Sequence, residues 1–316
     1  MRILVMGAGA LGSVAGGFLA RAGHEVHLVG RQPHMDAIKK NGLVIEGIWG
    51  THHIRMLTCA DFVEALPKTC YDYILVSVKS YDTAQTASLL LPVLSEKTWV
   101  CSYQNGLGNA ELLAKELGWK HVLGARVIFG ARMVEAGRVE VTVIAAPTAV
   151  GGYGAPQADA AARALATAMD EAGLPSLATD RIETILWSKV AYNCALNPLS
   201  ALFNVPYGAL AENADTREAM DQIIHEIYAV AAAKQVVMDP DSPEAFLTLF
   251  YTKMVPPTAA HYASMREDLH KGRRTEIDAL NGAIVQFGKS HNLACPANSL
   301  LTLLIHSREK NFFKAE

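Results

Sequence analysis

The chain has 316 residues, of which 51% are hydrophobic and 19% are charged, and its formal net charge is −3. This length is typical of two domains, and the composition is that of a globular protein. The weak negative charge argues against a nucleic-acid-binding protein or a basic membrane-surface protein. Without a signal peptide or an apolar run near the ~20 residues of a membrane span, the sequence predicts a cytoplasmic protein with no membrane partner.

The five cysteines and eleven histidines show no metal-binding pattern. The cysteines are odd in number and lack a CxxC spacing, which indicates reduced thiols in a reducing compartment. The adjacent His52 and His53 suit a strand or a turn better than a metal site. We therefore expect neither a metal nor disulfides.

Strand-like and helix-like stretches alternate in the first half of the chain. This alternation predicts a mainly parallel sheet with helices on both faces. The later strands, separated by GARMVEAGR, are expected to add to the far edge in antiparallel fashion. The expected strands are 2–6, 26–30, 43–47, 51–56, 72–78, 99–103, 122–130, 138–144 and 148–153, and the expected helices are 11–21, 83–94 and 110–117.

Beyond about Ala178 the strand pattern stops and helical patterns follow one another. We place the domain boundary near 173–180. This boundary gives a doubly wound α/β domain over residues 1–178 and an all-helical domain over residues 179–316. The expected helices of the second domain are 182–201, 216–234, 243–253, a long one over 263–291, and 297–310.

The stretch GAGALG at 7–12 follows a strand directly and opens a helix. In this context Gly7 permits the tight turn, Gly9 lets backbone N–H groups approach a pyrophosphate, and Gly12 lets the helix pack close to the strand. The alternative is a tight turn that binds no ligand. The dinucleotide interpretation assigns cofactor binding to Gly7, Ala8, Gly9, Ala10, Leu11 and Gly12.

The second strand ends at Gly30-Arg31 and carries no carboxylate there. NAD and FAD sites usually have an Asp or Glu at this place, which binds the ribose hydroxyls. A guanidinium instead binds a 2′-phosphate well. Arg31 therefore favours NADPH over NADH and FAD, with a solvated loop arginine as the alternative.

Lys79 and Asn105 follow two later strands. The carboxyl ends of strands in a doubly wound sheet line the cofactor crevice. Lys79 could reach the adenosine phosphate or ribose, or be an ordinary surface lysine. Asn105 is a candidate contact of the ribose or the substrate, although a turn alone explains the Asn-Gly pair.

Lys189, Asn193 and Asn197 are spaced four apart on the expected helix 182–201, so they stack along one ridge of an apolar face. Burial of an unpaired ammonium costs roughly several kcal/mol, so Lys189 needs a partner, a cavity or a depressed pKa. Alternatively, it snorkels to solvent. Pro198 is expected to end or kink this helix.

If 263–291 forms one helix, Glu276 lies within its apolar stripe, while Gly272 could bend the helix. A buried glutamate needs a cation or a hydroxyl donor. Lys189 is the candidate partner, either directly or across a substrate.

With these residues in place, the chain resembles the ketopantoate reductase (PanE/ApbA) family over nearly its whole length. The signatures are GAGALG with Gly30-Arg31, VSVKSYDT, QNGLGN, LWSKVAYNCALNPLSAL and SMREDLHKGRRTEIDALNG. The resemblance implies a Rossmann-type domain followed by a helical domain, as in 6-phosphogluconate dehydrogenase. It also implies NADPH-dependent reduction of 2-dehydropantoate to (R)-pantoate, on the path to pantothenate and coenzyme A, with the site in the cleft.

Carried onto the matching positions, the resemblance implies roles for individual residues. Lys189 matches the catalytic lysine of the family and Glu276 its catalytic glutamate. Arg31 and Lys79 match the groups that favour NADPH. The substrate-binding positions are matched by Asn105, Asn193, Asn197 and Ser264.

One position departs from the family pattern. Some members carry a substrate-binding asparagine within Pro-Asn-Gly, and here Tyr207 takes that place in NVPYG. The exact 2-oxo acid therefore stays open. The alternatives are an oxidoreductase of similar build that acts on another 2-oxo acid or on a 3-hydroxy acid, and an NADPH-binding redox sensor without chemistry. The sequence is compatible with a homodimer but does not determine the oligomeric state.

Overall fold

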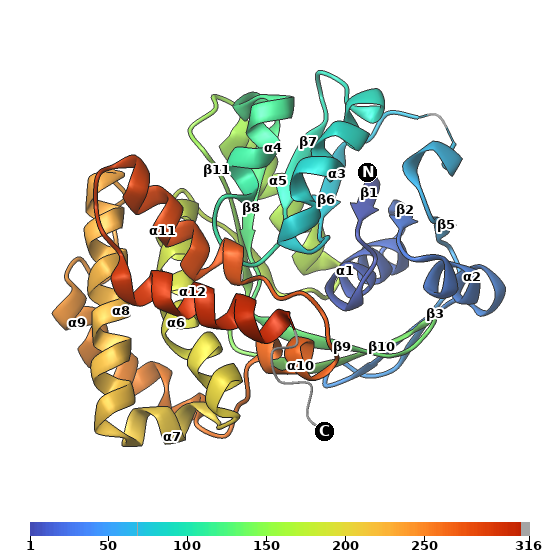
Figure 1. The fold of residues 1–316 in the computed structure, drawn as a ribbon. Helices are drawn as coiled ribbons and strands as arrows, with labels where there is room; N and C mark the ends of the chain where they lie inside the picture. Colours follow the sequence, from blue (N-terminus) through green and yellow to red (C-terminus); the bar gives the residue numbers. More distant parts are fainter. Residues whose placement is uncertain (68, 311–316) are drawn as a thin grey trace. The chain divides into compact units, whose positions relative to one another are not determined.

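The computed structural model describes residues 1–67 and 69–310. It contains two compact units (Figure 1). The first comprises Met1–Gln104 and Asn109–Ile182, and the second comprises Asn105–Gly108 with the chain from Glu183 onward. Among the described residues, no helix has the length and apolar character that a membrane crossing requires.

An eight-stranded sheet forms the centre of the first unit, in the strand order β12-β11-β8-β7-β6-β1-β2-β5. The six strands from β8 to β5 in this order run parallel, whereas β11 pairs antiparallel with β8 and parallel with β12. The expected mainly parallel sheet is thus confirmed. The strands are β1 (Arg2–Met6), β2 (Glu25–Val29), β5 (Thr58–Ala60), β6 (Tyr73–Val76), β7 (Trp99–Ser102), β8 (Val122–Arg126), β11 (Thr148–Gly152) and β12 (Ser176–Ala178).

Helices cover both faces of this sheet because successive strand residues point to opposite sides. Ile3 and Val5 belong to one core with α1 and α5, and Leu4 and Met6 belong to another with α3 and α4. The helices of this unit are α1 (Ala10–Arg21), α2 (Gln32–Asn41), α3 (Thr83–Leu90), α4 (Asn109–Leu117) and α5 (Ala158–Glu171).

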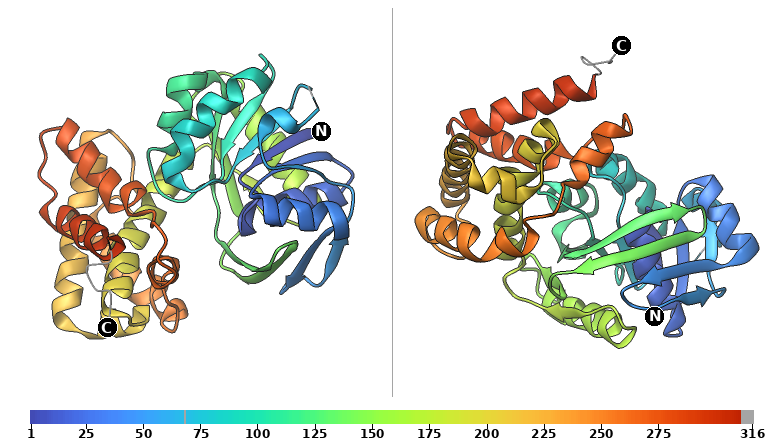
Figure 2. Two further views of the ribbon diagram at one scale, coloured as in Figure 1. Left: turned by 45° about the vertical axis from the view of Figure 1, so that its right-hand side comes forward. Right: turned by 90° about the horizontal axis from the view of Figure 1, so that it is seen from below.

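A second sheet, of order β4-β3-β10-β9, lies in the same unit. Its strands are β3 (Leu43–Gly47), β4 (His52–Ile54), β9 (Phe129–Glu135) and β10 (Arg138–Ile144). Figure 2 shows β9 and β10 beside β3 and β4, although they are distant in sequence. The expected antiparallel addition to the far edge of the main sheet is therefore wrong for β9 and β10, whereas β11 does pair there antiparallel with β8. The reason is that Ile45, Val139 and Val141 bury their side chains in the core that contains α1.

The second unit is helical in its described residues. Its long helix α6 is buried on most sides, and Val190, Ala191 and Cys194 are at most 1% exposed. Its helices are α6 (Ile182–Phe203), α7 (Tyr207–Glu212), α8 (Ala214–Ala233), α9 (Pro243–Leu249), the π-helical η5 (Phe250–Met254), α10 (Ser264–His270), the 3-10 turn η7 (Ile277–Ala279), α11 (Asn281–Ser290) and α12 (Pro296–Glu309).

The expected single helix over 263–291 is wrong. Helix α10 ends after seven residues, about two turns, because Gly272 adopts a left-handed conformation with φ of 60°. The N–H of Gly272 donates to the carbonyl of Leu269 at 3.1 Å, and that of Arg273 donates to the carbonyl of Asp268 at 2.8 Å. This pair of bonds is the Schellman pattern that ends helices. Glu276 consequently lies before η7 and not on a helical stripe.

Candidate active site

The glycine loop between β1 and α1 is shaped by two close approaches. Gly7 has φ of 99°, and a Cβ there would lie 2.4 Å from the backbone nitrogen of Val78. A Cβ on Gly12 would lie 2.4 Å from Oγ of Ser77. The hydroxyl of Ser77 donates to the carbonyl of Gly7 at 2.8 Å, so the residues after β6 hold this loop. The first and third glycines are therefore required by the fold itself.

Gly9 has no such structural requirement. Its φ of −76° suits any residue, and a Cβ there would meet only the carbonyl of Gly7, at 4.0 Å. Gly9 precedes the first turn of α1, where the first helical bond runs from the N–H of Ser13 to the carbonyl of Gly9 at 2.9 Å. The N–H groups of Ala10, Leu11 and Gly12 come before this bond and lie at the positive end of the helix. The open space and these donors fit a pyrophosphate.

A buried histidine, His34 of α2, supports the glycine loop through hydrogen bonds and was not predicted from the sequence. The N–H of Gly137 donates to Nδ1 of His34 at 2.8 Å, so the imidazole must carry its proton on Nε2. Nε2 then donates to the hydroxyl of Ser13 at 2.9 Å, and this hydroxyl donates to the carbonyl of Ala8 at 3.3 Å. This chain of bonds joins α2 and the β9–β10 turn to the glycine loop, and burial lowers the pKa of His34 from 6.5.

The network predicts a pH effect on stability. A histidine with a lowered pKa in the folded state is neutral there while the unfolded chain takes up a proton, so its stabilisation is present above about pH 6.5 and is lost as the pH falls. We expect the free energy of unfolding to fall more steeply from about pH 7 to pH 5 in the wild type than in a His34→Gln variant. Urea denaturation across this range measures both slopes, and equal slopes would contradict the assignment.

Arg31 and Lys79 follow the two strands that flank β1. Arg31 is exposed at the start of α2, directly after Gly30, whose α-carbon approaches Ala8 so closely that a Cβ would lie 3.0 Å from the alanine Cβ. Arg31 therefore stands beside the glycine loop. Lys79 is half-buried and precedes a 3-10 turn at Ser80–Asp82.

Lys189 of α6 meets a loop that comes from a distant part of the sequence. Its Nζ donates to Oδ1 of Asn105 at 2.7 Å. The loop 105–108 also bonds the segment after Glu276, because the N–H of Leu107 donates to the carbonyl of Ala279 at 2.8 Å. The structure thus brings Lys189 and Asn105 together. It also places the loop 105–108 against the segment that carries Glu276. Both Lys189 and Glu276 are half-buried.

Asn197 is 8% exposed and accepts a hydrogen bond at 2.6 Å from the hydroxyl of Tyr207, which is 4% exposed. The ring of Tyr207 makes edge-to-face contacts with Tyr192 and His261, at centroid distances of 6.0 and 5.2 Å. Because the tyrosine occupies the carbonyl oxygen of Asn197, the amide offers any further ligand its NH₂ group. Asn193 is half-buried on the same helix.

Helix α6 does not end at Pro198, contrary to one of the two expected outcomes. Proline has no N–H for the carbonyl of residue 194, four positions earlier. The side-chain amide of Asn281, which is fully buried, donates to this carbonyl of Cys194 at 3.2 Å. It also donates to Oδ1 of Asn298 at 3.0 Å, and the amide of Asn298 donates to Glu226 at 2.7 Å. Asn281 thus replaces the missing main-chain donor and lets the helix continue.

Ser264 is exposed at the first position of α10. The preceding residue, Ala263, donates its N–H to Oγ of Ser200 in α6 at 3.4 Å, so the start of α10 lies against α6. Asp268 is buried and forms an ion pair at 2.7 Å with Arg273, beyond the end of α10.

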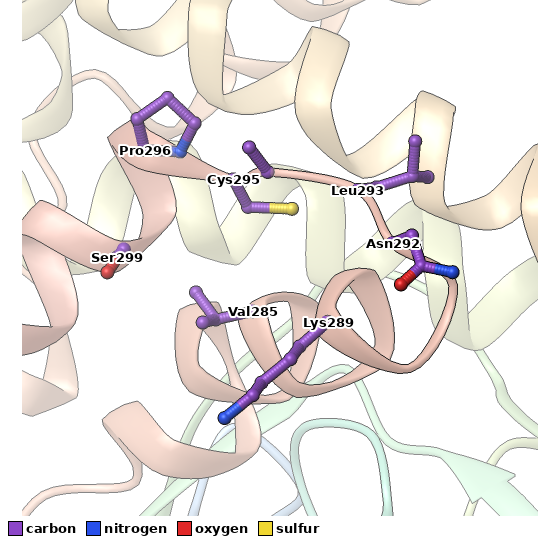
Figure 3. Close-up of a pocket in the computed structure, with 8 residues that line it drawn as sticks. Val285, Lys289, Asn292, Leu293, Cys295, Pro296 and Ser299 are labelled. Carbon is purple, nitrogen blue, oxygen red and sulfur yellow. The ribbon is translucent and has the colours of Figure 1, made fainter.

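A surface groove of about 520 Å³ lies between the end of α11 and the start of α12 (Figure 3). The first N–H groups of α12, on Ala297 and Asn298, donate to the carboxylate of Glu226 at 2.8 and 3.0 Å, so they are not available to bind an anion. Burial raises the pKa of the Cys295 thiol, so it is not an activated nucleophile. The groove is lined by Val285, Lys289, Asn292, Leu293, Ala294, Cys295, Pro296 and Ser299, none of them a predicted site residue.

The parallel sheet, the glycine loop at its carboxyl edge, and Lys189 of a buried helix bonded to Asn105 of a loop are features typical of a dinucleotide-dependent oxidoreductase. Residues 3–154 match the family model described as "Ketopantoate reductase PanE/ApbA", and residues 181–309 match the model of its C-terminal part. The chain belongs to the ketopantoate reductase PanE/ApbA family. The family expected from the sequence is thus confirmed.

Individual relatives cover almost the whole chain. The 2-dehydropantoate 2-reductase of Aquifex aeolicus is 39% identical over 310 residues, which are 98% of this chain and 97% of the relative. The structure of a PanE/ApbA family ketopantoate reductase from Ralstonia eutropha has a TM-score of 0.87 at 32% identity, covering 98% of this chain and 99% of that one. The structure of D-mandelate dehydrogenase with NADH and anilino(oxo)acetate has a TM-score of 0.86 at 26% identity, with the same coverage. These structures confirm the expected fold class.

Proposed function

We propose that this chain reduces 2-dehydropantoate to (R)-pantoate with NADPH, in the biosynthesis of pantothenate. In this proposal residues 1–178 bind the dinucleotide, and residues 179–316 bind the 2-oxo acid and supply the catalytic groups. Family membership and the relative from Aquifex aeolicus support the reaction. The observation that carries it is the bond of 2.7 Å between Nζ of Lys189 and Asn105, which holds an ammonium in place on a buried helix.

The residues of the first unit fit a dinucleotide. The loop 7–12 has open space at Gly9 and the donors of a helix N-terminus. Arg31 would bind the 2′-phosphate, while Lys79 would reach the adenosine phosphate or ribose and Asn105 the nicotinamide ribose or the substrate. When bound, the nicotinamide supplies the hydride.

The residues of the second unit supply the acid and the substrate contacts. The ammonium of Lys189 donates to Oδ1 of Asn105 at 2.7 Å. We assign to Lys189 the hydrogen bond to the ketone oxygen, the stabilisation of the developing alkoxide and its protonation. Glu276 orients the same hydroxyl or the lysine. Ser264, Asn193 and Asn197 hold the carboxylate and the distal hydroxyl.

A second candidate is reduction of another 2-oxo acid. Two observations favour it: the likeness to D-mandelate dehydrogenase, and Tyr207 in the place of an asparagine, with its hydroxyl on Asn197 and its ring beside Tyr192. Aromatic side chains at this position favour a 2-oxo acid whose distal group is larger or less polar. A sensor that binds NADPH without chemistry leaves the position of Lys189 unexplained.

One experiment separates these candidates. Oxidation of NADPH is followed by absorbance with 2-dehydropantoate, with other branched 2-oxo acids and with phenylglyoxylate. The proposal expects the highest kcat/KM for 2-dehydropantoate. A preference for phenylglyoxylate would transfer the function to the second candidate, and tight NADPH binding without any turnover would leave only the sensor.

The coenzyme preference gives a further prediction. Replacing Arg31 by alanine removes the guanidinium that we assign to the 2′-phosphate, whereas NADH has no such phosphate. We expect KM for NADPH to rise about 10-fold or more and KM for NADH to change less than about twofold. Steady-state kinetics with both coenzymes measure the ratio, and an unchanged ratio would assign the 2′-phosphate to another group.

A further inference from the structure

Arg126, the last residue of β8, is an unusual cation in the first unit. Its side chain is half-buried, and its Nη2 donates to the carbonyl of Pro147 at 3.1 Å. Its Nε is buried and has no hydrogen-bond partner within the described residues. Burial also lowers the pKa of Arg126. The guanidinium is therefore partly withdrawn from water, while in the described part of the chain its hydrogen-bond acceptor is an uncharged carbonyl oxygen.

Two neighbouring arginines in the second sheet behave differently. Arg132 and Arg138 are more exposed, yet each forms a short ion pair, with Glu140 at 2.5 Å and with Glu46 at 2.6 Å. A guanidinium loses more by desolvation when no counter-charge accompanies it. Arg132 and Arg138 are better solvated and have carboxylate partners. The buried Nε of Arg126 has no hydrogen-bond partner in the described residues. An anionic ligand would supply the counter-charge and the hydrogen-bond acceptor that the described residues around Arg126 do not supply.

The strand order indicates which anion this is. β8 is parallel to β7, β6 and β1, so Arg126 ends its strand at the same edge of the sheet as the glycine loop. With about 4.8 Å between neighbouring strands, β8 lies roughly 14 Å from β1 and 19 Å from β2. The dinucleotide phosphates are assigned to the loop after β1 and to Arg31 after β2, on the other side. The remaining anion of the proposed reaction is the carboxylate of the 2-oxo acid, to which the proposed function assigns only the uncharged side chains of Ser264, Asn193 and Asn197 and therefore no counter-charge.

We propose that Arg126 binds the carboxylate of the 2-oxo acid substrate, with its planar guanidinium donating two parallel hydrogen bonds. This inference rests on the proposed function. Such fork-to-fork pairs are short and directional, and they fix the plane of the carboxylate as well as its place. Arg126 is thus a residue that selects 2-oxo acids over neutral ketones.

The test is the Arg126→Gln variant, measured with the 2-oxo acid that the wild type reduces best and with the corresponding 2-oxo amide. We expect KM for the acid to rise about 10- to 100-fold, because charge-assisted hydrogen bonds are lost. KM for NADPH and the kinetics of the neutral amide are expected to stay within about twofold of the wild type. Inhibition by oxamate, an unreactive 2-oxo acid analogue, should weaken by the same factor as KM for the acid rises.

Arg132→Gln is the matched control, since it removes an exposed arginine of the same unit. An unchanged KM for the acid and an unchanged Ki for oxamate in Arg126→Gln would overturn the inference, and so would an equal loss in the control. Equal losses with acid and amide would also overturn it, because they indicate a structural effect. If Arg126→Gln does not fold, Arg126→Lys keeps the charge but not the fork, and a rise in KM confined to the acid is then expected. A wild type that turns over no 2-oxo acid overturns the proposed function itself, before any variant is made.

Discussion

The Lys189→Met variant is expected to lose about 10³-fold in kcat while it binds NADPH as the wild type does. Methionine keeps most of the aliphatic volume on α6 but removes the ammonium that donates to Asn105 at 2.7 Å. In the proposed reaction this ammonium stabilises the alkoxide and protonates it, and each of these roles is typically worth about 10²- to 10³-fold or more. Single-turnover absorbance at saturating NADPH measures the chemical step directly.

Lys253→Met serves as the control, since Lys253 is exposed in the same unit. Its kcat is expected to equal that of the wild type. A Lys189→Met enzyme with more than about a tenth of wild-type kcat would remove the lysine from the role of acid. A parallel loss of NADPH binding would instead indicate that the substitution disturbs the fold.

The glycine loop gives the second large effect, and here two glycines of one motif are expected to differ. Gly7→Ala should lower the free energy of unfolding by about 3 kcal/mol or more, because its φ is positive and the new Cβ would lie 2.4 Å from the nitrogen of Val78. Gly9→Ala should cost less than about 1 kcal/mol, since its backbone suits alanine and the methyl group meets only open space.

Dinucleotide binding should show the complementary pattern. The open space at Gly9 is where we place the pyrophosphate, so Gly9→Ala is expected to raise the Kd for NADPH about 10-fold or more with the fold intact. Urea denaturation and fluorescence titration measure the two quantities. A stable Gly9→Ala variant with wild-type affinity would exclude the loop as the pyrophosphate site.

Local sequence patterns predicted the main sheet well and the second sheet poorly. The longer strands of the main sheet are continuous apolar runs, such as RILVM and YILV, so they could be found one at a time. The pairing of β3 with β10 joins residues 44–47 to residues 138–141, and no local pattern encodes such a partner. Helix α5 was missed because its buried face consists largely of alanines, whose periodicity is weak. β5 and β12 have three residues each, too few to show a period.

In the candidate site, too, some residues could be predicted from local sequence patterns and others could not. Lys189, Asn193 and Asn197 could be found because polar groups on an apolar helix face violate the pattern around them. His34 gave no signal, since its partners Ser13 and Gly137 come from distant elements. Arg126 had a signal, a cation at the end of an apolar strand, like that of Lys79. The bond from Tyr207 to Asn197 depends on a turn geometry that the sequence did not reveal.

The amide of Asn281 couples two positions that are 83 residues apart in sequence, because it gives the carbonyl of Cys194 the proton donor that Pro198 lacks. Alanine at position 198 would restore a main-chain donor there and would free position 281 to vary. Loss of the asparagine while the proline remains would leave the buried carbonyl of Cys194 without this hydrogen-bond donor. The order of substitutions therefore matters in the evolution of this helix: the proline must be lost first, and only then is the asparagine dispensable.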